Sequence, residues 1–141
     1  MPLAVTEAEL QALLEEFALA RNYGLELESI ADGECVLRVP FQQWLERPGA
    51  IVGGPVLMAA ADIAMWLAIM TKLGKTDGSV TAEMKTNFLG SARGESFLCR
   101  ARILKLGKRL IYGTAECTTL AGKLIAHHTI TYIRPEANES A

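Results

Sequence analysis

One carboxylate stands alone in the most apolar stretch of the chain. The segment GGPVLMAAADIAMWLAI, residues 53–69, contains Asp62 as its single ionisable residue, and no other charge lies between Arg47 and Lys72. A buried carboxylate is unfavourable unless it is hydrogen-bonded or used. Such a group can accept a proton from water as a general base, or attack an electrophilic carbon itself. Two interpretations are open: a catalytic carboxylate, or a structural one that bonds a backbone group or caps a neighbour.

The same segment begins with residues that suit the N-terminus of a helix. Pro55 fits the first helical turn, because its missing N–H would have no partner there. The sequence predicts a helix from Pro55 to about Lys72, ended by Gly74. The backbone N–H of Gly54 then points outward at the positive end of the helix dipole, where it can donate to a developing oxyanion. Gly54 has no side chain to block a substrate.

The rest of the chain supplies the elements that must position these groups. Thr6 and Glu9 match a capping box, and the helical spacing behind them predicts an N-terminal helix over about residues 6–19. Residues 40–54 lack a clean period and are interpreted as a loop. Alternating apolar and polar residues predict strands at 25–30, 34–39, 79–88, 96–106, 109–119 and 123–133. Short turns separate the last four strands, which predicts an antiparallel meander.

One long apolar helix and several strands define the fold class. A helix that is apolar nearly all round must be covered on most of its sides. The sequence therefore predicts an α+β fold in which a curved antiparallel β-sheet wraps around one long central α-helix. The 141 residues suit a single domain, 1–141, with a core at about 25–133 and a polar tail at 135–141.

Composition and charge exclude several classes of protein. The formal net charge of −2 argues against a nucleic-acid-binding protein. A central Asp costs about 2.5–3.5 kcal/mol on membrane-insertion scales, so the apolar helix is expected in a core and no membrane is expected as a partner. The N-terminus turns acidic too early for a signal peptide, which favours a cytoplasmic protein. The widely spaced Cys35, Cys99 and Cys117 suit reduced thiols and predict no metal site.

Four segments in a fixed order carry a resemblance to a known family. They read GGPVLMAAADIA, SVTAEMKTNFLGSARGE, LKLGKR and AGKLIAHHTITY. Together they resemble the hotdog-fold thioesterases, and within them the phenylacetic-acid-degradation (PaaI-like) type of acyl-CoA thioesterase. The resemblance covers roughly residues 25–133. It implies a hotdog fold and a homodimer whose two sheets join, with a dimer of dimers beyond it; dimer or tetramer stays open.

The resemblance also implies an activity and roles for single residues. It implies hydrolysis of an acyl- or aryl-CoA thioester, with no cofactor apart from the coenzyme A of the substrate. Asp62 would be the base or nucleophile, opposite the Gly54 amide of the other protomer. Thr81 aligns with a Ser or Thr that positions water, although an ordinary β-branched strand residue is the alternative. Asn87 is either a polar group at the cleft or a strand-end residue.

The sequence departs from the family pattern at two positions before the acid. Gly53 stands nine residues before Asp62, where the family has a His, and Arg47 stands where an Asn is common. Both positions are assigned to substrate binding. Lys108 and Arg109 are candidates for the phosphates of coenzyme A, because Arg can bind phosphate through two hydrogen bonds. A solvated hairpin tip is the alternative for this pair.

Three functions compete at this level. The leading one is an acyl-CoA thioesterase that uses Asp62 and the Gly54 amide. The second is a non-catalytic protein that binds acyl-CoA or an acyl-thioester, which the missing His favours and the retained Asp62 opposes. A hotdog hydratase or dehydratase ranks last, because no His precedes Asp62. Candidates for the wall of an acyl pocket are Leu57, Met58, Met65 and Trp66.

Overall fold

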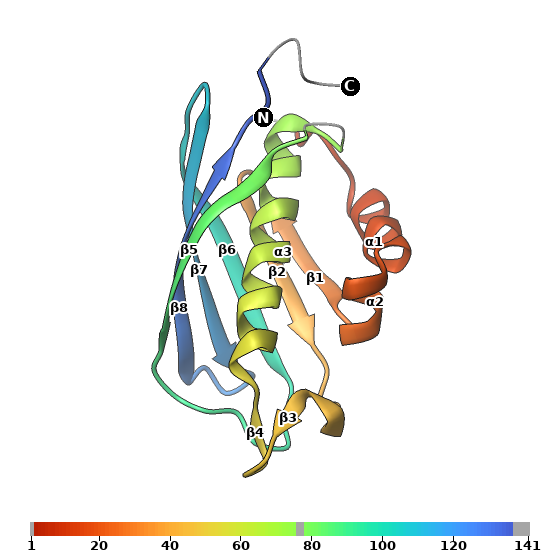
Figure 1. Ribbon diagram of the computed structural model, residues 1–141. Coiled ribbons are helices and arrows are strands. Elements are labelled where there is room, and N and C mark those ends of the chain that lie inside the picture. The colour runs from red at the N-terminus through yellow and green to blue at the C-terminus, as the bar shows by residue number, and fades with distance from the viewer. Residues whose placement is uncertain (1, 76–77, 137–141) are drawn as a thin grey trace.

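The computed structural model describes residues 2–75 and 78–136 as one helix-on-sheet unit (Figure 1). The elements are α1 (Glu7–Glu16), α2 (Ala18–Tyr23), β1 (Glu26–Ala31), β2 (Glu34–Val39), the 3-10 helix η1 (Gln43–Leu45), β3 (Glu46–Arg47), β4 (Ile51–Val52), α3 (Gly54–Leu73), β5 (Val80–Phe88), β6 (Phe97–Leu106), β7 (Leu110–Thr119) and β8 (Leu124–Ile133). The long helix α3 lies along one face of a large sheet. The short helices α1 and α2 lie beside β1 (Figure 1).

The large sheet is antiparallel and has the strand order β1-β2-β6-β7-β8-β5. A six-stranded sheet on one central helix is the hotdog arrangement, so the predicted fold class is confirmed. The predicted four-strand meander is wrong in one respect, because β5 pairs with β8 and not with β6. Residues 89–96 carry the chain across the sheet, since β7 and β8 lie between β5 and β6. Turn residues in a sequence show where one strand ends and the next begins, but they do not show which strands pair in the sheet.

Phe17 interrupts the predicted N-terminal helix. The capping box is present: Thr6 Oγ1 accepts from the Glu9 N–H, and the Glu9 carboxylate accepts from the Thr6 N–H. The single helix predicted over residues 6–19 is wrong, because Phe17 is extended (ψ 106°) and separates α1 from α2. The break brings the Phe17 ring edge-on to Trp66 of α3, with ring centroids 5.7 Å apart. Tertiary contacts of this kind override helical propensity.

The region predicted as a loop, residues 40–54, holds the start of α3 in place. It contains η1 and the small β3–β4 hairpin, which the sequence did not predict because both are too short for a period to show. The Gly53 N–H donates to the Leu45 carbonyl (N···O 3.0 Å), and the Val52 N–H donates to the Ala92 carbonyl (3.0 Å). These bonds place the first residue of α3 at Gly54, one residue before the predicted start.

The helix α3 forms the apolar centre of the protein. By length and composition it could cross a membrane, but 67% of its most apolar window is buried inside the protein. The sheet and the N-terminal segment cover it, as expected for a core helix. Its buried residues are Val56, Leu57, Ala60, Ala61, Ile63, Ala64, Met65, Leu67, Ala68, Ile69, Met70 and Thr71.

Gly113 of β7 allows α3 to approach the sheet closely. A Cβ atom at this position would lie 2.5 Å from the carbonyl oxygen of Arg102 and would overlap the end of the Met65 side chain. That carbonyl belongs to the neighbouring strand and cannot move without disturbing the β6–β7 pairing. We predict that Gly113→Ala lowers the free energy of unfolding, measured in urea, by about 1–3 kcal/mol, as overpacking does.

The control for this prediction is Thr114→Ala, one position along the same strand. Alternation in a strand turns the Thr114 side chain to the opposite face of the sheet, away from α3. This change should lower the free energy of unfolding by less than about 1 kcal/mol. Equal losses for the two variants would contradict the close approach as the cause.

A group of polar side chains is buried between the sheet and α3. His128 is fully buried; its Nδ1 lies 2.8 Å from Thr86 Oγ1, and its Nε2 lies 3.5 Å from the Cys117 sulfur. Hydrogen bonds to Cys99 and to His128 lower the pKa of the Cys117 thiol to about 6, whereas burial raises the pKa of Cys35 to about 12. The three cysteines are free and buried. These groups satisfy one another, and we assign them to the core.

Candidate active site

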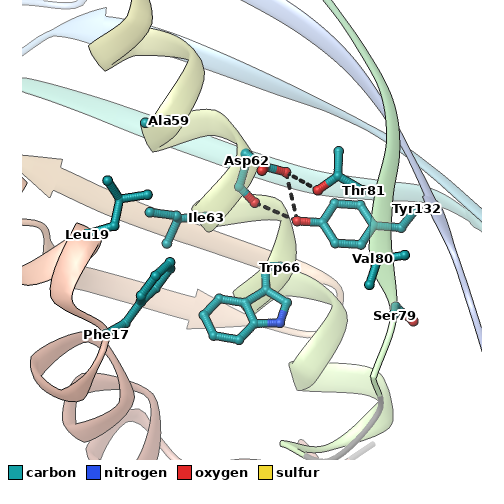
Figure 2. A pocket seen from close by; sticks show the side chains of 10 residues that line it. All are labelled: Phe17, Leu19, Ala59, Asp62, Ile63, Trp66, Ser79, Val80, Thr81 and Tyr132. Atoms are coloured by element: carbon teal, nitrogen blue, oxygen red, sulfur yellow. Dashed lines mark hydrogen bonds between the residues drawn. The ribbon is translucent and has the colours of Figure 1, made fainter. Parts of the chain in front are cut away.

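Asp62 lies on α3 opposite the beginning of β5 and the end of β8 (Figure 2). Its side chain is half-buried, and its Oδ1 accepts two hydrogen bonds. Thr81 Oγ1 donates at 2.7 Å, and Tyr132 Oη donates at 2.8 Å. Thr81 and Tyr132 are directly paired between β5 and β8, so the sheet brings both hydroxyls to the same carboxylate oxygen. The structure thus joins Asp62 and Thr81, two of the residues singled out from the sequence.

Tyr132 is the residue of this site that the sequence analysis missed. Its hydroxyl also lies 3.0 Å from the backbone carbonyl oxygen of Asp62. Burial, together with the adjacent Asp62 carboxylate, raises the pKa of Tyr132 well above its usual range, so the hydroxyl remains a donor. The one available signal was strand alternation, which places Tyr132 on the same face as the buried Ile130. A tyrosine among inward-facing residues needs a partner for its hydroxyl.

A pocket of about 490 Å³ opens beside these three side chains. Its walls come from α3, the beginning of β5, the end of β8 and the break between α1 and α2 (Figure 2). The lining residues are Phe17, Leu19, Ala59, Asp62, Ile63, Trp66, Ser79, Val80, Thr81 and Tyr132. Most of the lining is apolar, so the pocket suits an apolar group held next to a carboxylate.

One of the four residues predicted for the pocket wall, Trp66, lines this pocket. Within one chain the other three do not line it: Leu57 and Met65 are buried in the core, and Met58 is exposed outside the pocket. Because α3 is apolar nearly all round, its sequence does not reveal which stripe faces the pocket. The structure shows the stripe of Ala59, Asp62, Ile63 and Trp66, with the spacing of one helix face.

Gly54 is the first residue of α3, and its N–H therefore has no acceptor within the helix. It lies eight residues from Asp62, or about 12 Å along the helix axis. The Phe88 ring at the end of β5 packs against it, and a Cβ atom on residue 54 would lie 3.1 Å from Phe88 Cε1. This packing gives a reason for glycine here beyond substrate access. Within one chain, the Gly54 N–H is too far away to act on a group bonded to Asp62.

Comparison with known proteins decides the family. The sequence model of the thioesterase superfamily matches residues 49–126, a stretch that contains Gly54, Asp62 and Thr81. The chain belongs to the thioesterase superfamily. Tyr132 lies beyond the matched stretch, so its place in this thioesterase comes from the structure alone.

Relatives and solved structures cover most of the chain. A protein of Saccharolobus solfataricus with a provisional esterase name is 35% identical over 104 residues, which are 74% of this chain and 69% of the relative. The zebrafish thioesterase superfamily member 2 is 25% identical with a TM-score of 0.86, covering 93% of this chain and 99% of that chain. The Escherichia coli PaaI protein from the phenylacetic acid degradation operon shares the fold, at 20% identity and a TM-score of 0.82, covering 92% and 91%. The resemblance to the hotdog-fold thioesterases is confirmed, and the general class is that of the thioester hydrolases.

The two positions at which this thioesterase departs from the family pattern lie near Gly54. Gly53 is the N-cap residue of α3 and contributes only its backbone, whose N–H donates to Leu45. Arg47 is exposed in β3. Neither residue lines the Asp62 pocket. A substrate contact of either residue would therefore lie at the Gly54 end of α3, outside the Asp62 pocket.

The structure does not bring the other predicted binding residues of the thioesterase to the pocket. Asn87 pairs with His127, on the sheet face opposite to that of Thr86. Lys108 and Arg109 lie exposed between β6 and β7, and Arg109 Nη1 forms an ion pair with Glu136 at 3.2 Å. Binding of coenzyme A phosphates by Lys108 and Arg109 stays a prediction.

Proposed function

We propose that this thioesterase hydrolyses acyl-CoA or aryl-CoA thioesters to the free acid and coenzyme A. The observation that carries the proposal is the Asp62 carboxylate, which is held by Thr81 and Tyr132 in the wall of an apolar pocket. The pocket suits the acyl group, and the carboxylate then lies beside the thioester carbon. Phe17 and Trp66 offer aromatic surfaces to that group.

Hydrolysis needs a base or nucleophile, and a donor for the carbonyl oxygen. With Asp62 as base, the carboxylate takes a proton from water while the water oxygen attacks the thioester carbon. The carbonyl oxygen becomes negative and accepts a hydrogen bond from the N–H of Gly54 of the partner subunit. The C–S bond then breaks, the carbonyl reforms, and the sulfur leaves with the proton from Asp62. With Asp62 as nucleophile, a carboxylate oxygen attacks the thioester carbon, the C–S bond breaks and coenzyme A leaves as the thiolate. Water then hydrolyses the acyl-enzyme anhydride to the free acid and restores Asp62.

Asp62 and a Gly54 N–H can act on the same thioester only if they come from two different chains. β5 is an edge strand, with β8 as its neighbour, and the residues Val80 and Phe88 at its two ends are 61% and 55% exposed. Pairing two β5 strands antiparallel about a two-fold axis places the Phe88 end of one against the Val80 end of the other. Because Gly54 packs on Phe88 and Asp62 binds Thr81, each Asp62 then approaches a Gly54 amide of the partner subunit. We therefore include a homodimer in the proposal, with a dimer of dimers as the larger assembly.

A non-catalytic acyl-CoA-binding protein is the second candidate. Gly53 and Arg47, which replace the His and Asn of the family pattern, favour it. The carboxylate and its two hydroxyl donors favour turnover, and we rank hydrolysis first. The proposal further includes a cytoplasmic location and no cofactor apart from the coenzyme A of the substrate.

Release of free thiol from a panel of aryl-CoAs and fatty acyl-CoAs of graded length tests the proposal. We expect turnover of at least one ester with a kcat/KM of about 10⁴ M⁻¹s⁻¹ or more. The acyl length at which kcat/KM falls reports the depth of the pocket. Saturable binding of a CoA ester without thiol release would establish the second candidate instead. Water addition to an enoyl-CoA without thiol release would favour the hydratase.

A further inference from the structure

We propose that Tyr132 is a positioning residue that holds Asp62 Oδ1, so that Oδ2 is the oxygen that takes part in the reaction. This inference rests on the proposed function, because it assigns one carboxylate oxygen to positioning and the other to the reaction. Thr81 and Tyr132 both donate to Oδ1, at 2.7 Å and 2.8 Å. In the part of the chain that the structure describes, no hydrogen bond to Oδ2 is formed, and Oδ2 lies on the side away from both hydroxyls (Figure 2).

The Tyr132 hydroxyl contacts both the side chain and the backbone of Asp62. The same hydroxyl lies 2.8 Å from Oδ1 and 3.0 Å from the backbone carbonyl oxygen of Asp62. Its single proton is therefore shared between two acceptors on one residue. The ring is anchored, because Tyr132 is only 3% exposed and is paired in β8 with both β5 and β7. An anchored donor that contacts both the backbone and the side chain of Asp62 restricts rotation of the carboxylate.

The two donors reach Oδ1 from different strands. Thr81 comes from β5, an edge strand, whereas Tyr132 comes from β8, an interior strand. Movement of β5 alone would leave Tyr132 in contact with Oδ1. The raised pKa of Tyr132 keeps its hydroxyl protonated, so it cannot replace Asp62 as the base. Tyr132 therefore holds the carboxylate through Oδ1 without reacting itself, and among the described residues Oδ2 has no hydrogen-bond partner.

Tyr132→Phe tests this role, because it removes the hydroxyl and keeps the ring. The loss of one hydrogen bond to a charged group should lower kcat by about 10- to 100-fold. KM should stay within about twofold, since the ring still completes the pocket wall. A crystal structure of the variant should show Asp62 in a second rotamer or with Oδ2 displaced. Tyr112→Phe removes an exposed tyrosine hydroxyl from β7 and should leave kcat unchanged.

The outcomes separate the inference from the proposed function. If the wild-type chain hydrolyses a CoA ester and Tyr132→Phe keeps the wild-type kcat with Asp62 unmoved, the inference is wrong and the function stands. A loss that appears as a higher KM at constant kcat would make Tyr132 a wall of the pocket, which also overturns the inference. If no ester is hydrolysed, the proposed function fails, and the Asp62 rotamer in the crystal structure of Tyr132→Phe decides whether Tyr132 positions it.

Discussion

Replacement of Asp62 by asparagine is expected to lower kcat for thioester hydrolysis by about 10²- to 10⁴-fold, the usual contribution of a general base. The amide oxygen of asparagine can still accept the hydroxyls of Thr81 and Tyr132, which preserves the local structure. The amide nitrogen then replaces Oδ2 and offers neither a negative charge nor a basic lone pair. The change therefore removes the chemistry and keeps the packing. Free-thiol release from the best CoA ester of the panel measures kcat, and thermal denaturation reports the fold.

Asp32→Asn is the matched control for this prediction. Asp32 lies outside the pocket, where it forms an exposed ion pair with Lys72 at 3.0 Å. Exposed pairs of this kind contribute little to stability, about 0–1 kcal/mol. The control should therefore keep kcat within about twofold and fold normally. Wild-type kcat in Asp62→Asn would show that the carboxylate is structural, the alternative that the sequence left open.

Mixing two inactive variants is expected to restore activity if the site is shared between two chains. Gly54→Pro removes the N–H that would donate to the oxyanion, at a helix position that tolerates proline, and should lower kcat by about 10²- to 10³-fold. After joint unfolding and refolding with Asp62→Asn, half of the dimers should contain one chain of each kind. In every mixed dimer one site combines an intact Asp62 with an intact Gly54. The mixture should therefore recover about a quarter of the wild-type rate.

Pro55→Ala is the control for the change at the start of α3. It restores an N–H to the first turn and should leave kcat within a few-fold of the wild type, because Gly54 keeps its own N–H. Phe88 lies against Gly54 and is more than half exposed, so its ring can move aside for the new proline. Affinity tags on the two variants verify that mixed dimers form. No recovery of activity in purified mixed dimers would contradict a site that is shared across the dimer.

Much of the fold could be predicted from the sequence, and the errors share one cause. The apolar run after Pro55 and the alternation in the strands are local signals, and they located α3 and all six strands of the large sheet. The break at Phe17 depends on a contact with Trp66, about fifty residues away. The pairing of β5 with β8 likewise depends on where residues 89–96 carry the chain. Neither contact leaves a local periodic pattern.

The candidate site was predicted in part. Asp62 stood out because one charge in an apolar run is visible in a single sequence. Gly54 and Thr81 were identified because the segments that contain them resemble the family. Asn87 lies on the opposite sheet face from Thr86, because residues one position apart in a strand point to opposite sides. The β-bulge between Thr81 and Glu83 changes this alternation along β5, so the face of each later residue cannot be counted from Thr81.

By itself, the sequence determined the α+β class, the apolar core helix and the single carboxylate within it. Local periodicity and composition suffice for these, because each depends on residues that are near one another in the chain. Tertiary structure decided which face of α3 lines the pocket, and it brought Tyr132 to Asp62 from seventy residues away. Both features depend on packing between distant elements and on pairing between distant strands, which no local pattern of residues encodes.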